Sequence, residues 1–322
     1  MSGATASGGR LNAGYAYRSR IAPADHGRAL LDYLADRYPH STAADWLARL
    51  EGGEVAVGTE TVTADAVLRT GDAVVWQRPP WREAAVPERF DVLHDDGDVL
   101  AVAKPSGLPT LPAGGFLEHT LLHLVRRRWP AAHAVHRLGR ATSGVVLFAL
   151  SPLAATALTR AMRERQLAKT YLALVSGAPA WRRLDVTTPI GRIPHPRLGT
   201  VHAASDAGRE AHSRFAVVEP RGDTTLVEVS IATGRPHQIR IHAAVAGHPL
   251  AGDPVYAAGG GLREAPGLPG DNGYLLHAWR VSFVHPRTAR ACAVIAPPPA
   301  ALAARDGSDD ASGGRGRDPL AL

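Results

Sequence analysis

Two segments of the chain gather residue types that bind anions and move protons. The first, HRLGRATSG, runs from His136 to Gly144, and the second, TGRPHQIRIH, runs from Thr233 to His242. The second segment follows a strand rich in Val and Ile and is predicted to open a helix. Its first backbone N–H groups and the positive end of the helix would then meet a ligand above Gly234. This arrangement predicts an anion site.

The helix predicted in the second segment has one polar and one apolar side. His237 and Arg240 are three residues apart and therefore share a face. The apolar stripe consists of Ile239, His242, Ala243 and Ala246. Arg240 is thus predicted to point at a site or at a buried partner, and the plainer alternative is an arginine that only ties the helix to a sheet.

The spacing of the histidines argues against a metal site. His237 and His242 are five residues apart, not the four that place two imidazoles on one helical face, and no acidic residue follows until Asp253. GRATSG lacks the Gly-Lys-Ser/Thr element of a phosphate-binding loop, and the glycine run at 259–261 is predicted to be a mobile loop and not a nucleotide-binding one. Neither a metal nor a nucleotide cofactor is expected.

The charge of the chain predicts a polyanionic partner. Lys and Arg number 36 against 30 Asp and Glu, which gives a net charge of +6. Between His119 and Arg163 there is no acidic residue, and seven arginines occur there: Arg126, Arg127, Arg128, Arg137, Arg140, Arg160 and Arg163. A composition biased towards arginine would explain the net charge equally well. For Arg126 to Arg128, the alternative is that they form a solvent-exposed face of a helix.

Cysteine content and hydropathy limit the compartment. Cys292 is the only cysteine, so an intramolecular disulfide or a Cys-based zinc site is excluded and a cytoplasmic location is expected. The first twenty residues have no apolar core, and the longest apolar stretch, 144–158, is too short to span a bilayer. No membrane role is expected.

The pattern along the chain predicts two folded parts. The expected stretches are a flexible tail over 1–16, a small α/β module over 17–80, a Pro-rich linker over 81–89, a larger domain over 90–297 and a flexible tail over 298–322. In the larger domain strands and helices alternate without a regular βαβ series. This predicts an α+β fold with a mixed, mainly antiparallel sheet and flanking helices. Ser151 is expected to cap a helix that starts at Pro152.

Six pieces of the larger domain together resemble RluA-type RNA pseudouridine synthases, in the order of that family. They are VAKPSGLPTLP (Val102 to Pro112), HRLGRATSG, KTYLALVSG (Lys169 to Gly177), GREAHSRF (Gly208 to Phe215), TGRPHQIRIHAAVAGHPLAGDPVY (Thr233 to Tyr256) and LLHAWRVSFVHP (Leu275 to Pro286). The module over 17–80 is similar to the alpha-L-type RNA-binding module that often precedes this catalytic domain.

The resemblance implies a reaction that needs no cofactor. A uridine is flipped out of the RNA, its base detaches from the sugar, turns, and reattaches through carbon five. In the family an Asp follows HRL and reacts at the sugar as nucleophile or proton acceptor, a Tyr lies against the base, and an Arg pairs with the Asp. The Tyr corresponds to Tyr171, the Arg to Arg240, and the Asp position to Gly139. RNA contacts are expected from Lys104, His136, Arg137, Arg140, Arg235, His237 and Gln238.

Gly139 is a departure with chemical consequences, since a glycine can neither attack the sugar nor accept a proton. The nearest acids in the sequence are Glu118 and Glu164, and Arg240 is expected to lose its partner. A carboxylate from elsewhere, a bound phosphate, or water must then compensate. The candidates for a distant carboxylate are Asp98, Glu210 and Asp253.

Two functions are therefore expected from the sequence. The first is an RNA pseudouridine synthase that acts on ribosomal or transfer RNA through a rearranged site. The second is a catalytically inactive RNA-binding homologue that works in ribosome assembly or as an RNA chaperone. A small-molecule enzyme on the same scaffold is a third class, because fold does not fix function, but no residue favours it.

Overall fold

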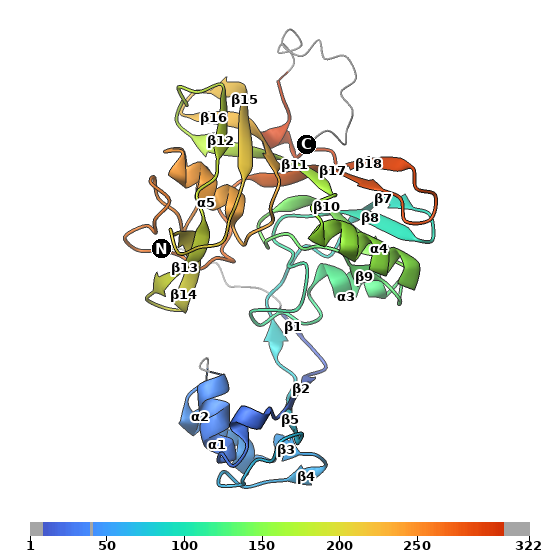
Figure 1. Ribbon diagram of the computed structural model, residues 1–322, viewed down its shortest axis with the longest axis vertical. Coiled ribbons are helices and arrows are strands. Elements are labelled where there is room, and N and C mark those ends of the chain that lie inside the picture. Colours follow the sequence, from blue (N-terminus) through green and yellow to red (C-terminus); the bar gives the residue numbers. More distant parts are fainter. Residues whose placement is uncertain (1–8, 39–40, 306–322) are drawn as a thin grey trace. The chain divides into compact units, whose positions relative to one another are not determined.

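The computed structural model describes residues 9–38 and 41–305. The chain forms two compact units, of which the first ends at Ala85 and the second begins at Val86 (Figure 1). Within the described residues no helix is both long enough and apolar enough to cross a membrane.

The first unit is a pair of helices packed on a small sheet. Its elements are β1 (Arg10–Leu11), β2 (Tyr15–Arg20), η1 (Pro23–Asp25), α1 (Leu30–Arg37), α2 (Ala43–Glu51), β3 (Val55–Val57), β4 (Glu60–Thr61), β5 (Ala73–Arg78) and β6 (Arg82–Glu83). The sheet has the order β2-β5-β3-β4, and β1 pairs separately with β6. Thr42 and Asp45 form a reciprocal capping box that starts α2, and Trp46 lies buried in the core.

Parts of both expected tails are held in structure. Strand β1 pairs with β6, and Asn12 Nδ2 donates to Glu83 Oε1 at 2.6 Å. At the other end Leu302 is buried against the sheet of the second unit. Residues 10–12 and Leu302, which were expected to belong to flexible tails at 1–16 and 298–322, are therefore part of the folded units. Local periodicity did not predict this, because the residues that they contact are distant in the sequence. Residues 1–8 and 306–322 of these tails lie outside the described residues.

The second unit is built on a ten-stranded sheet. Its elements are β7 (Asp91–Asp95), β8 (Val99–Lys104), α3 (Leu121–Arg126), β9 (His133–Ala134), β10 (Ser143–Ala149), α4 (Pro152–Arg163), β11 (Ala168–Ser176), β12 (Arg183–Val186), β13 (Ile190–His195), β14 (Gly199–Ala204), β15 (Ser213–Arg221), β16 (Thr224–Ile231), α5 (Gln238–Val245), β17 (Leu276–Val284), β18 (Ala291–Ile295) and η2 (Ala300–Leu302). The main order is β12-β15-β16-β11-β17-β10-β8-β7, with β18 beside β17 and β9 beside β10. All these pairs are antiparallel except β10 with β17, which confirms the mixed, mainly antiparallel sheet.

Helices cover the two faces of this sheet. Val146 and Phe148 of β10 belong to the core that includes residues of α3 and α5, whereas Val145 and Leu147 belong to the core that includes residues of α4. This alternation is the period of two that a buried strand requires. As expected, Ser151 caps α4: its Oγ accepts from the Ala154 N–H at 3.2 Å, and Pro152 is the first residue of the helix.

Candidate active site

The HRLGRATSG loop is fixed against β17 by the one parallel strand pair of the sheet. Ser143 and Gly144 lie opposite His277 and Ala278, and Ser143 Oγ and His277 Nδ1 are 2.8 Å apart. Gly144 has a φ of 111°, and a Cβ there would overlap the backbone of Ala278. Only glycine lets β10 start this close to β17. The loop that precedes Gly144 is therefore held beside the strand.

The two motifs found in the sequence meet at one cavity of about 340 Å³, a volume typical of small-molecule sites, roughly 300–1,000 Å³. The lining residues are His136, Arg137, Leu138, Gly139, Thr142, Met162, Lys169, Tyr171, Ile231, Gly234, Arg235, His237, Gln238, Ile239, Arg240, Tyr274 and Leu276. Lys169 and Tyr171 both reach it because they are two apart on β11 and share a face. The structure thus brings Gly139, Tyr171 and Arg240 together, as predicted. No Asp or Glu is among these described lining residues.

Arg240 has a partner, contrary to the expectation that Gly139 would leave it unpaired. Its Nε and Nη2 donate to the two carboxylate oxygens of Asp253 at 2.6 and 2.8 Å, and its Nη1 donates to the carbonyl of Pro269 at 2.9 Å. The side chains of the pair are 2% and 0% exposed. Of the three candidate distant carboxylates, Asp253 is therefore the buried partner of Arg240.

Asp253 is fully occupied by this structural role. Beyond Arg240 it accepts N–H groups from Val255 at 2.8 Å and Tyr256 at 3.2 Å. Burial acts to raise the pKa of Asp253, but the Arg240 guanidinium and these N–H groups outweigh it and hold the pKa below its usual value. Asp253 stays ionised behind Arg240 and does not line the cavity.

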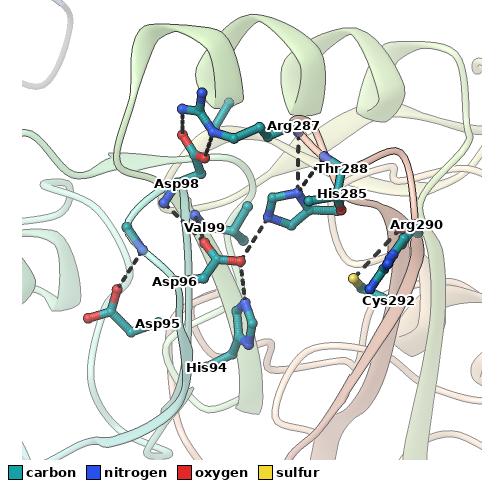
Figure 2. Close-up of polar contacts among 12 residues, drawn as sticks. His94, Asp95, Asp96, Asp98, Val99, His285, Arg287, Thr288, Arg290 and Cys292 are labelled. Carbon is teal, nitrogen blue, oxygen red and sulfur yellow. Dashed lines mark hydrogen bonds and ion pairs between the residues drawn. The ribbon is translucent and has the colours of Figure 1, made fainter.

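The other two candidate carboxylates also lie outside the cavity. Asp98 accepts hydrogen bonds from Ser151 Oγ and from Arg287 Nη2, both at 2.7 Å (Figure 2). The nearby Asp96 is hydrogen-bonded to His94 and His285. The hydrogen bonds from Arg287 and Ser151 lower the pKa of Asp98 to about 2.

Glu210 is at the surface. It forms an exposed ion pair with Arg165, whose Nη2 lies 3.3 Å from Oε2. Neither Asp98 nor Glu210 is placed to act on a substrate in the cavity.

The two histidines of the cavity are neutral and held by hydrogen bonds. His136 Nε2 accepts the Leu147 N–H at 3.2 Å, and burial, with the charge of Lys169, lowers its pKa to about 3. His237 precedes the first residue of α5 with a φ of 57°, a left-handed conformation unusual for a residue other than glycine. Its Nδ1 lies 2.6 Å from Tyr256 Oη, and burial followed by the Arg240 charge lowers its pKa to about 3.

Lys169 and Tyr171 form the floor of the cavity on β11. Lys169 Nζ lies 3.2 Å from the sulfur of Met162, and burial lowers its pKa to about 8. Tyr171 is 7% exposed, and burial raises its pKa. A neutral phenol ring in this place suits stacking against a base.

Two of the residues expected to contact RNA have structural roles instead. Lys104 is 1% exposed, and its ammonium donates to the carbonyls of Pro105, Leu108 and Arg140 at 2.8, 2.7 and 3.1 Å. Burial lowers the pKa of Lys104 to about 7, whereas three acceptors favour the charged form. All three N–H groups of the Lys104 ammonium are thus used to hold the backbone carbonyls of Pro105, Leu108 and Arg140, and none is free to bind phosphate.

Gln238 is similarly occupied. Its Oε1 accepts from Thr233 Oγ1 and the Arg235 N–H, at 2.7 and 3.0 Å, and its Nε2 donates to His212 O and Ser213 Oγ at 2.8 and 2.9 Å. Although it lines the cavity, Gln238 therefore shapes the turn before α5 and has no hydrogen-bonding group left for RNA.

The arginines of the motifs differ in their freedom to bind RNA. Arg137 is exposed at the cavity. Arg235 also lines it, and its Nε donates to the Glu210 carbonyl at 2.7 Å. Arg140 does not line the cavity, and its guanidinium carbon lies 5.5 Å from the centre of the Phe116 ring. Of these three arginines, Arg137 and Arg235 are the two that line the cavity.

Lys169 and Tyr274 line the cavity, although neither was predicted as a site residue from the sequence. The alternation of β11 could have found Lys169, because it is two residues before Tyr171. Tyr274 comes directly before the LLHAWRVSFVHP piece, and no local signal indicates that its ring reaches the other motif. Tyr274 is 5% exposed, and its Oη lies 3.4 Å from Thr142 Oγ1.

The chain is similar to a known protein family over most of its length. A family model described as RNA pseudouridylate synthase matches residues 98–245. The chain is 39% identical over 276 residues to an uncharacterized RNA pseudouridine synthase of Synechocystis sp., which spans 85% of this chain and 95% of that protein. It is 34% identical to RNA pseudouridine synthase 5 of Oryza sativa subsp. japonica, over 93% of this chain and 91% of that protein.

A solved structure shows the same likeness. Human RNA Pseudouridylate Synthase Domain Containing 1 aligns with a TM-score of 0.54 and 25% identity, over 67% of this chain and 86% of that one. The chain therefore belongs to the RNA pseudouridine synthase family, and the predicted RluA-type resemblance is confirmed.

Proposed function

We propose that the protein converts a uridine of ribosomal or transfer RNA to pseudouridine in the cavity between the two motifs, without a carboxylate at position 139. The flipped base would lie against Tyr171, and Arg137 and Arg235 would hold the flanking phosphates. Ribosomal RNA is supported by Ribosomal large subunit pseudouridine synthase D of Xylella fastidiosa, which is 33% identical over 89% of this chain and 90% of that protein. The single cysteine supports a cytoplasmic location.

One observation carries this proposal: Tyr171, Arg240 and residue 139 line the same cavity. The buried pair with Asp253 keeps Arg240 in place although no acid stands at position 139. The rest of the binding site therefore does not depend on the missing carboxylate.

The inactive RNA-binding homologue is the second candidate, and one observation favours it. No Asp or Glu is among the described residues that line the cavity. This candidate predicts RNA binding that weakens linearly in log affinity as log salt rises, with no isomerisation.

The test uses the purified full chain and total RNA from cells that lack its gene. Pseudouridine is mapped in that RNA before and after incubation by a readout sensitive to base modification. The proposal expects one or a few new pseudouridines at defined positions. RNA that is bound at low salt and left unmodified would favour the inactive homologue.

A further inference from the structure

Tyr274 contributes the side-chain atom that lies nearest to position 139, apart from the residues directly before and after Gly139. A Cβ built on Gly139 would lie 3.2 Å from Tyr274 Oη and 3.4 Å from Thr142 Oγ1. A side chain at position 139 would therefore begin in tight contact with the phenol oxygen, which would have to move by a few tenths of an ångström. The hydroxyl of Tyr274 thus lies at the place in the cavity where a side chain of residue 139 would start.

We infer that the Tyr274 hydroxyl is the nucleophile that attacks C1′ of the flipped uridine, in the place of a carboxylate at residue 139. This inference rests on the proposed function. Tyrosine acts as the nucleophile at an anomeric carbon in some glycoside hydrolases, so the chemistry is within the reach of a phenol.

The surroundings of Tyr274 suit this role. The guanidinium carbon of Arg240 lies 4.2 Å from the centre of the Tyr274 ring, and Arg240 is itself held by Asp253. A guanidinium held in place over the ring face fixes the orientation of the ring, and with it the position of the phenol oxygen beside residue 139. The Tyr274 hydroxyl is hydrogen-bonded to the Thr142 hydroxyl, with an Oη–Oγ1 distance of 3.4 Å.

The other reactive groups of the cavity fit the role less well. Tyr171 is the other phenol, but no arginine stacks on its ring among the described residues, and burial raises its pKa. His136 uses its Nε2 as an acceptor for the Leu147 N–H. Lys169 has an amine whose cationic form predominates at neutral pH, since its pKa is about 8.

The proposed step balances without another reactant. The phenol oxygen bonds to C1′ as the C1′–N1 bond breaks with its electron pair on N1, and the phenol proton passes to N1. After the uracil turns, the C5–C6 π electrons form the C5–C1′ bond, and the bond from C1′ to the phenol oxygen breaks. The C5 proton then returns to that oxygen, and the C5–C6 double bond re-forms. The product carries a proton on N1, and Tyr274 is regenerated.

The decisive variant is Tyr274→Phe, which keeps the ring against Arg240 and removes only the hydroxyl. On the RNA site mapped with the wild type, kcat is expected to fall by about 10²- to 10⁴-fold, with KM and RNA affinity little changed. Tyr33→Phe is the matched control, because it removes a buried tyrosine hydroxyl from the first unit. Thermal unfolding of both variants confirms that they fold.

A double-mutant cycle separates chemistry from packing. Gly139→Ala places a methyl group against the phenol oxygen and is expected to lower kcat roughly 10-fold, by displacing that oxygen. In the Tyr274→Phe background the same change should have little further effect, because the group it displaces is already gone. Additive losses would contradict a shared mechanism.

The outcomes distinguish this inference from the proposed function. If the wild type forms pseudouridine and Tyr274→Phe keeps its full kcat, the inference is overturned and the proposed function stands. If the wild type forms no pseudouridine in RNA that lacks it, both are overturned.

Discussion

Arg240 and Asp253 form a buried, bidentate ion pair, with Nε–Oδ2 and Nη2–Oδ1 distances of 2.6 and 2.8 Å. A buried cation that loses its partner is strongly destabilising. Asp253→Asn is therefore expected to lower the free energy of unfolding by about 3–5 kcal/mol. Chemical denaturation measures this, and Glu210→Gln, which alters an exposed pair, is the control. A loss as small as that of the control would show that the pair contributes little.

Stability should fall in acid because His136 is buried in its neutral form. Its pKa is about 3 in the folded protein against 6.5 unfolded, so the unfolded chain binds more protons between these values. The free energy of unfolding should thus decrease as the pH falls from about 6.5 towards 3. His136→Gln keeps a hydrogen-bond acceptor but does not titrate, and its unfolding free energy should depend less steeply on pH. An unchanged slope would show that His136 does not cause the acid sensitivity.

Lys169 should make stability rise at alkaline pH. Its pKa is about 8 when folded against 10.5 unfolded, and the unfolded chain binds more protons between these values. The free energy of unfolding gains up to about 3 kcal/mol from this group as the pH rises from about 8 to 10.5. Lys169→Met should be more stable than the wild type near pH 7, and the difference should shrink towards pH 10. Urea unfolding at both values measures it, and a constant difference would contradict the low pKa.

Arg137 should contribute to RNA affinity through phosphate, because its side chain is exposed at the cavity. Arg137→Ala is expected to weaken binding to different RNA sequences by a similar factor and to reduce the slope of log affinity against log salt by about 1. Filter binding over a salt series measures both. Arg290→Ala, at an exposed residue that does not line the cavity, is the control. Equal effects of the two variants would mean that only overall charge matters.

The sequence predicted those parts of the fold that depend on local patterns. The Ser151 cap and the start of α4 at Pro152 follow from the residue types at these two positions. The resemblance to RluA-type synthases implied that Gly139, Tyr171 and Arg240 belong to one site, and all three line the cavity. The cap depends on residue type within a short segment, whereas the grouping of the three site residues came from the family pattern.

The partners of the site residues depend on contacts between distant segments. Arg240 pairs with Asp253 through the turn after α5, and Tyr274 reaches Gly139 because β17 runs beside β10. Lys104 is another case: its residue type suggests phosphate binding, and three backbone carbonyls around it decide otherwise. Such contacts follow from tertiary packing, which spacing in the sequence does not specify.

Catalysis without a carboxylate at position 139 is tested most directly by the amount of pseudouridine that the wild type and Gly139→Asp form at one mapped uridine. RNA from cells that lack the gene is incubated with each protein, and the modified fraction is measured over time. The wild type, with glycine at 139, is expected to modify that uridine repeatedly, with more product than enzyme. No product from the wild type together with product from Gly139→Asp would contradict it.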